Sequence, residues 1–262
     1  MLLAVDIGNS STKFGLFDGE DLISKFSILT IRDAGALSVS DAVGGRLNQT
    51  FDAAIIASVV PEMDQPIREY LQLKRNIDPV FIDHSFNFGL KINYEPITSA
   101  GIDRLVNAAA AAAKYSKPCV VCSFGTATTI DAVSKEGEFL GGVIAPGMRT
   151  MAKALHIATS KLPKVEIEKP ENLLGNSTVD SIRSGVFYGY VAMVEGLIAR
   201  ISKSYAFTRE AITAEAVTLT VAATGGLAEV IAPEIDAITI VNRDLTLEGL
   251  RMLYLRHKNE QI

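Results

Sequence analysis

The chain has 262 residues, of which 25 are basic and 30 acidic, so its formal net charge at pH 7 is −5 and its isoelectric point is about 5.3. This balance argues against a general nucleic-acid binder, which needs a basic face. No window stays apolar for the roughly 18 residues of a membrane-spanning helix. The N-terminus enters a strand without the basic region and cleavage site of a secretory signal, so we expect a cytoplasmic protein.

The first half of the chain predicts the order β-β-β-α-β-α-β. The apolar run 2–8 is typical of a central strand, and Asp18-Gly19 is a strong hairpin signal that leads into a third strand over 21–29. The further expected elements are a helix within 33–49, a buried strand over 53–60, a helix over 62–73, a strand over 79–82 and an alanine-rich helix over 101–115.

Lys117-Pro118 opens the second half, so we expect one domain over 1–116 and another over 117–262. The region 158–178 holds two prolines and many lysines and glutamates, and we interpret it as a lid-like loop. The other expected elements are strands over 119–124, 129–134 and 138–145, helices over 147–157, 180–203 and 245–257, and a strand over 217–226 that runs into a Gly-Gly turn.

One pattern occurs twice, as AVDIGNSSTKFGLFDG near the start and as VVCSFGTATTIDAV past residue 118. Each copy is an apolar strand, a turn of glycine with small hydroxyl or amide residues, and a second strand. Such turns suit a phosphate chain, because small residues let the backbone come close and polar side chains donate hydrogen bonds. The turn residues are Asp6, Gly8, Asn9, Ser10 and Ser11 in the first copy and Ser123, Gly125, Thr126, Thr128 and Thr129 in the second.

Asp6 lies where an apolar strand ends, an unusual place for a charge without a partner. A carboxylate beside bound phosphates can hold Mg²⁺, usually through water. The same residue could instead cap the turn by accepting hydrogen bonds from backbone amides. Asp6 alone does not decide between the two, but the paired turns favour the magnesium interpretation.

Two further segments are candidates for chemistry. The Gly225-Gly226 pair follows a strand and would let a flat ring or a sugar approach the backbone, although a simple tight turn has the same sequence. GIDR at 101–104 opens a helix, which places Asp103 in the first turn, where the macrodipole favours an anion. Arg104 offers a planar fork suited to a carboxylate. Without the other motifs, we would interpret this pair as an acidic residue at a helix start followed by a solvated arginine.

The cysteines and histidines give no metal or redox signal. Cys119 and Cys122 lie three residues apart on one expected strand, so their side chains point to opposite faces and we expect buried structural thiols. His84, His156 and His257 have no ligand spacing.

Taken together, the motifs resemble those of the type III pantothenate kinases over nearly the whole chain. They are DIGNSSTKFGLFDG, SVVP, Y-x(6)-GIDRLVNA, FGTATTIDAV, LGGVIAPGM, GNSTVDSIRSGVFYGY, ATGG and LTLEGL. The resemblance implies an α/β protein of the actin-like ATPase fold, with two ribonuclease-H-like domains in tandem, each a mixed five-stranded sheet with flanking helices. It also implies ATP-dependent phosphorylation of pantothenate, the first step towards coenzyme A.

The same resemblance implies roles for individual residues. Asp103 would orient or deprotonate the pantothenate hydroxyl, and Arg104 would pair with the pantothenate carboxylate. The other pantothenate contacts would be Tyr94, Gly101, Ile102 and Thr178. The ATP contacts would be Asp6, Gly8, Asn9, Ser10, Ser11, Thr12, Lys13, Gly125 and Thr126 at the phosphates, with Gly225 and Gly226 near the nucleoside. The family works as a homodimer with Mg²⁺ and a monovalent cation, K⁺ or NH₄⁺.

The chain departs from the family at Ser123, where an aspartate usually precedes FGTATT and helps bind the monovalent cation. A neutral hydroxyl is a weaker ligand for a hard cation than a carboxylate is. Two alternatives to an active pantothenate kinase therefore remain open. One is a catalytically impaired nucleotide-binding or regulatory relative, and the other is a kinase of the same superfamily that acts on another acceptor.

Overall fold

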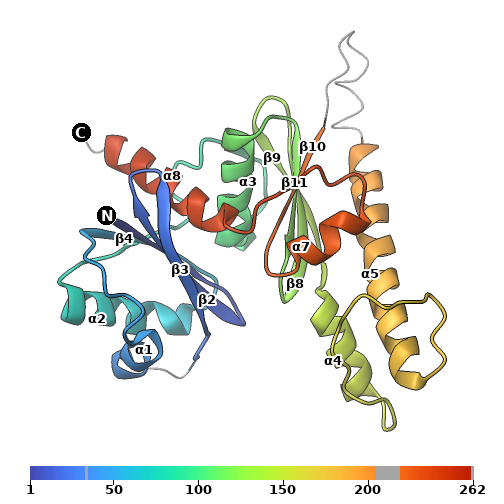
Figure 1. Cartoon of the computed structure of the whole chain (residues 1–262). Helices are drawn as coiled ribbons and strands as arrows, with labels where there is room; N and C mark the ends of the chain where they lie inside the picture. The colour runs from blue at the N-terminus through green and yellow to red at the C-terminus, as the bar shows by residue number, and fades with distance from the viewer. Residues whose placement is uncertain (33–34, 205–218, 261–262) are drawn as a thin grey trace. The chain divides into compact units, whose positions relative to one another are not determined.

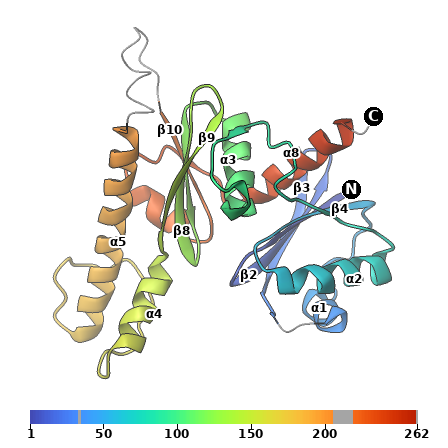
Figure 2. The same ribbon diagram turned by 180° about the vertical axis from the view of Figure 1, so that it is seen from behind.

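The computed structural model describes residues 1–32, 35–204 and 219–260 (Figures 1 and 2). By packing, the chain forms two compact units. The first unit comprises Met1–Ala113 with Asp244–Ile262, and the second comprises Lys114–Arg243. Among the described residues no helix is long and apolar enough to cross a membrane.

The first unit is built on a mixed five-stranded sheet with the order β3-β2-β1-β4-β5. The first three strands form an antiparallel meander, and β4 and β5 continue the sheet in parallel with β1. The strands are β1 (Leu2–Ile7), β2 (Ser11–Asp18), β3 (Asp21–Leu29), β4 (Ala53–Ser58) and β5 (Val80–Phe81). This is the sheet that the sequence predicts.

Helices cover both faces of this sheet. Helices α1 (Ala36–Val43) and α2 (Asp64–Arg75) pack on the face that carries Val5 and Ile7 (Figure 1). The opposite face carries α8 (Leu245–Glu260), which also packs against α3 (Ile102–Lys114). The short elements of this unit are the strand β6 (Lys91–Ile92) and the 3₁₀ turns Pro61–Met63 and Ile97–Ser99.

Helix α8 is where the division by packing differs from the expected domains 1–116 and 117–262. Its residues Leu247, Leu250 and Leu253 are buried, and the helix contacts β1, β2 and β4. Close approach is possible because Gly249 lies against Val106 and Ala110 of α3, with no room for a Cβ atom. The end of the chain therefore returns to the first sheet, which the order of elements along the sequence does not reveal.

The second unit repeats the arrangement. Its strands are β7 (Cys119–Phe124), β8 (Ala127–Val133), β9 (Glu138–Pro146), β10 (Thr220–Thr224) and β11 (Ile240–Val241). Within the unit they have the order β11-β10-β7-β8-β9. Strands β7, β8 and β9 form the antiparallel meander, and β10 and β11 extend the sheet in parallel with β7. Each strand thus has its counterpart in the first unit, as the duplicated motif predicts.

The helices of the second unit follow the predicted pattern. The long helix α5 (Thr178–Ser202) packs Phe187, Tyr190 and Val194 into a core with Phe124 of β7. Helix α4 (Met148–Ala158) lies beside α5 (Figure 2), and between them 159–177 contain no helix or strand. The unit also contains α7 (Ala228–Ile231) and the 3₁₀ turn Ala232–Glu234. The expected start of one helix at 33–34 and of one strand at 217–218 lies outside the described residues.

Candidate active site

The turn between β1 and β2 is held by hydrogen bonds from the end of β3. The amide of Gly8 donates to the carbonyl of Ser11 (3.1 Å), and the Thr30 hydroxyl donates to the Gly8 carbonyl (2.6 Å). The Arg32 guanidinium donates to the side-chain oxygen of Asn9 (2.7 Å). These bonds fix a compact turn with exposed amide and hydroxyl groups, which is what binding a phosphate chain requires. Thr30 and Arg32 were not among the residues expected from the sequence.

Asp6 and Lys13 form an ion pair beside this turn. They are register partners on β1 and β2, and the Lys13 ammonium lies 3.1 Å from the Asp6 carboxylate. Asp6 is only 6% exposed, whereas Val5 and Ile7 face the opposite side into the core. A charge at this depth needs a partner, and Lys13 supplies it. Asp6 is therefore a buried carboxylate near the end of β1 with an ion-pair partner on β2.

The second turn, between β7 and β8, is tied to the start of α4. The Gly125 amide donates to the Ala127 carbonyl (3.1 Å). The Thr126 carbonyl accepts from both the Gly147 amide (3.0 Å) and the Thr150 hydroxyl (2.6 Å). Helix α4 thus fixes the position of the turn that carries Thr126.

Gly225 and Gly226 follow β10 and lie next to this turn. Gly225 has φ +93°, and a Cβ atom there would lie 2.6 Å from the Phe124 carbonyl oxygen. Only glycine fits this position. Gly226 has open space around it. The pair brings bare backbone close to the end of β7.

The pairing registers relate the polar ends of the two sheets residue by residue. In the first sheet Asp6 lies between Lys13 and Ala57, and in the second Ser123 lies between Thr129 and Thr224. The charged pair of the first copy is therefore replaced by three hydroxyl groups in the second. The Thr224 hydroxyl is buried without a hydrogen-bond partner among the described residues. A buried unpaired hydroxyl beside two others is a place where a ligand can be bound.

Asp103 and Arg104 open α3 in the first unit, as the sequence predicts. The Asp103 carboxylate lies over Gly101, where a Cβ atom would be 2.6 Å from Oδ1. Arg104 is 4% exposed, and its guanidinium lies 5.5 Å from the centre of the Tyr94 ring and 3.4 Å from the Tyr94 hydroxyl oxygen. The structure therefore brings together Tyr94, Gly101, Asp103 and Arg104, and Ile102 in the same turn is buried.

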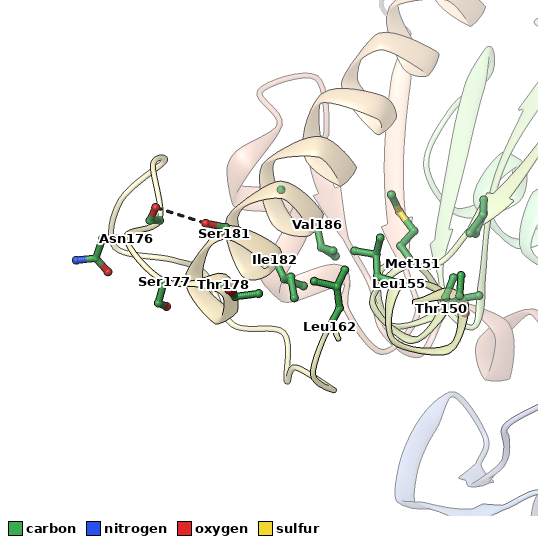
Figure 3. A pocket seen from close by; sticks show the side chains of 15 residues that line it. Thr150, Met151, Leu155, Leu162, Asn176, Ser177, Thr178, Ser181, Ile182 and Val186 are labelled. Atoms are coloured by element: carbon green, nitrogen blue, oxygen red, sulfur yellow. Dashed lines mark hydrogen bonds between the residues drawn. The ribbon is translucent and has the colours of Figure 1, made fainter. Parts of the chain in front are cut away.

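Thr178 begins α5 in the second unit, at the rim of a cavity of about 1090 Å³ (Figure 3). Met151 and Leu155 of α4 line the cavity opposite Ile182 and Val186 of α5. The helix start is capped, because the Ser177 hydroxyl accepts from the Asp180 amide (3.1 Å). The sequence predicts the loop before α5 but not this apolar cavity, since the lining residues are spread over two helices.

The thiols lie in the core of the second unit. Cys119 and Cys122 are both free and fully buried, and burial raises the pKa of each thiol well above its usual value. This confirms the expectation of structural cysteines. Among the described residues, no three His, Cys, Asp or Glu side chains are grouped so that they could hold a metal ion.

Comparison with known proteins identifies relatives across the whole chain. The family described as type III pantothenate kinase matches residues 2–200. The type III pantothenate kinase of Syntrophotalea carbinolica is 39% identical over 98% of this chain and 100% of its own length. That of Desulforapulum autotrophicum is 40% identical over 97% of this chain and 96% of its own.

Two solved structures share the fold at low sequence identity. One is described as a Baf family transcriptional activator from Campylobacter jejuni, with a TM-score of 0.60 and 21% identity over 98% of this chain and 99% of that one. The other is a ROK family glucokinase from Streptomyces griseus in complex with glucose and AMPPNP, with a TM-score of 0.54 and 13% identity over 96% and 98%. The two-domain actin-like ATPase fold expected from the sequence is confirmed.

Proposed function

The chain belongs to the type III pantothenate kinase family, and on that premise we propose that it transfers the γ-phosphate of ATP to the hydroxyl of pantothenate. The observation that carries the proposal to this chain is the group at the start of α3. A buried arginine held against Tyr94 lies next to the Asp103 carboxylate. One helix start therefore offers both a cation that can bind an acidic acceptor and an oxygen that can accept a proton. We further propose that the protein is a cytoplasmic homodimer, without nucleic-acid or membrane partners.

For the nucleotide, we propose that the two turns bind the phosphates. In the first turn the contacts come from Asp6, Gly8, Asn9, Ser10, Ser11, Thr12 and Lys13, and in the second from Gly125 and Thr126. Lys13 can turn from Asp6 towards a phosphate, because its side chain is one-third exposed. Gly225 packs against the end of β7 and Gly226 beside it is exposed with open space around it, which supports a contact of this backbone with the nucleoside.

For the acceptor, we propose that Arg104 binds the pantothenate carboxylate through its planar fork. Asp103 orients the acceptor hydroxyl and accepts its proton. An aspartate at a helix start is a weak base, but the loose transition state of phosphoryl transfer depends more on positioning and charge stabilisation than on early proton removal. Tyr94, Gly101, Ile102 and Thr178 complete the contacts.

Two cations enter the proposal. Asp6 is the carboxylate that would hold Mg²⁺ through water, and the metal would neutralise charge on the transferred phosphate. A monovalent cation, K⁺ or NH₄⁺, would lie at Ser123 with Thr129 and Thr224. The buried Thr224 hydroxyl without a protein partner supports a ligand at this position. Three neutral hydroxyls would hold the cation more weakly than a site with a carboxylate.

The test is to incubate the purified protein with ATP, Mg²⁺ and pantothenate and to detect phosphopantothenate by mass spectrometry. In the same assay, Arg104→Lys should raise the KM for pantothenate at least about tenfold while leaving the KM for ATP nearly unchanged, because lysine cannot form the two-pronged bond to a carboxylate.

Arg68→Lys, a matched substitution at a partly exposed arginine of α2, should leave both KM values unchanged. Binding of ATP and pantothenate without any product, across potassium and ammonium salts, would contradict the proposed activity. An equal rise in both KM values for Arg104→Lys would contradict the assigned role of the arginine.

A further inference from the structure

A second cavity, of about 650 Å³, lies in the second unit between one face of α4 and the extended segment 164–167. Arg149, Lys153 and His156 line it from α4 at spacings of four and three residues, which place them on one helix face. None of its lining residues belongs to the predicted ATP or pantothenate contacts. The cavity is thus separate from the candidate active site.

Positive charge is concentrated at this cavity. Residues 147–164 contain Arg149, Lys153, Lys161 and Lys164 and no aspartate or glutamate, although the whole chain has a net charge of −5. Three of these four side chains line the cavity, and Glu166 is the one carboxylate in the lining. Within the described part of the chain, none of the three lining cations takes part in an ion pair. With three cations against one carboxylate, the lining keeps a net positive charge.

The wall opposite α4 is anchored rather than loose. Val165 is 8% exposed and belongs to the core of the second unit, and Ile167 packs against that core. The Arg183 side chain donates to the Glu166 carbonyl (3.4 Å). The floor is apolar, with Ala152 and Val165 buried. A fixed concave site with an apolar floor and a rim of net positive charge suits a ligand that has a doubly charged anionic group on an apolar body.

We propose that this cavity is a binding site for a small phosphorylated molecule with an apolar part, distinct from the kinase substrates. The Arg149 guanidinium offers a planar fork to phosphate oxygens, and Lys153 and Lys164 add point charges from opposite walls. The His156 Nδ1 donates to the Leu162 carbonyl oxygen (2.8 Å), which holds the imidazole ring in place at the cavity. The apolar body of the ligand rests on the floor of the cavity.

The absence of tryptophan from the chain allows a local test. Ile157 lines the cavity and is 70% exposed, so Ile157→Trp places the sole tryptophan there without disturbing the core. Phenyl phosphate, with a phosphate dianion on an apolar ring, is the probe, and phenol is its uncharged control. A saturating non-hydrolysable ATP analogue fills the nucleotide site. We expect phenyl phosphate to change the fluorescence saturably and phenol to leave it unchanged.

In the Ile157→Trp protein, adding Lys153→Ala and Lys164→Ala together should raise the dissociation constant of phenyl phosphate at least about tenfold. The pair Lys74→Ala and Lys258→Ala removes the same charge from exposed sites elsewhere and should leave the affinity unchanged. Calorimetric titration of the tryptophan-free protein should give the same affinity. Equal affinity in both double variants, or the same response from Leu73→Trp on α2, would overturn the proposal. Kinase activity is not the readout, so this result is independent of the proposed function.

Discussion

At the scale of single residues, the two halves of the duplicated motif have diverged in charge. The first retains Asp6 with Lys13 as its ion-pair partner, 3.1 Å away, whereas the second has hydroxyl groups at the corresponding positions. We propose that this ion pair opens when a hydrated metal and a phosphate bind, because each of its members is attracted to the ligand of opposite charge. The second turn offers neutral oxygens alone from Ser123, Thr129 and Thr224.

Restoring a carboxylate in the second copy tests this difference. Ser123→Asp should create a stronger cation site beside Thr129 and Thr224, since a carboxylate is a better ligand for a hard cation than a hydroxyl is. In KCl at about ten times the dissociation constant, the variant should gain about 1.4 kcal/mol of stability over the same protein in choline chloride. Thermal unfolding in the two salts measures this without reference to activity.

The matched control is Ser123→Asn, which has nearly the same shape as the aspartate but no charge. It should respond to KCl as the parent protein does. If the aspartate and asparagine variants show the same dependence on potassium, the cation does not bind at Ser123 and its assignment to this position is wrong.

At the scale of elements, the two glycines at the end of β10 differ in how tightly their surroundings constrain them. Gly225 has a positive φ and lies in contact with the backbone of Phe124, whereas Gly226 has free space around it. Gly225→Ala should therefore destabilise the second unit by about 1–3 kcal/mol, because an alanine is strained at this φ and its methyl group meets backbone atoms. Urea unfolding provides the measurement.

Gly226→Ala is the control within the same turn, and it should change the free energy of unfolding by no more than about 0.5 kcal/mol. Equal effects at the two positions would mean that the turn does not have the described conformation. A loss of ATP affinity in the Gly226 variant at unchanged stability would support the proposed contact of this backbone with the nucleoside.

The elements that the sequence predicts well are those with a local signal. The Asp18-Gly19 turn, the apolar run at 53–60 and the duplicated Gly-Ser/Thr turns are each specified by neighbouring residues, and each is present. The Arg104 contact with Tyr94 has no local signal in the sequence, since the two residues lie ten positions apart and the chain between them includes the 3₁₀ turn Ile97–Ser99. The cavity at α4 and α5 has no local signal, because it depends on how two helices pack.

At the scale of the whole molecule, the packing assigns α8 to the first unit although the chain reaches it last. The repeat of strands predicts two halves in sequence order; the two sheets follow that order along the chain, whereas α8 packs in the first unit. The reason is a pair of long-range contacts. Gly249 allows close approach to α3, and the Thr246 hydroxyl donates to the Asn107 side chain (2.8 Å). Contacts between residues far apart in the sequence produce no periodic pattern, so the position of α8 could not be predicted from the sequence.

This assignment predicts where a core substitution in α8 acts. Leu250 is fully buried, so Leu250→Ala should lower stability by about 2–5 kcal/mol through lost apolar contact and a residual cavity. Leu255→Ala, on the same helix at 45% exposure, should cost no more than about 0.5 kcal/mol. In hydrogen exchange, the Leu250 variant should lose protection in β1, β2 and β4, which α8 contacts. Because β7, β8 and β9 belong to the other unit, they should keep their protection, and a uniform loss over both sheets would contradict the division of the chain at Asp244.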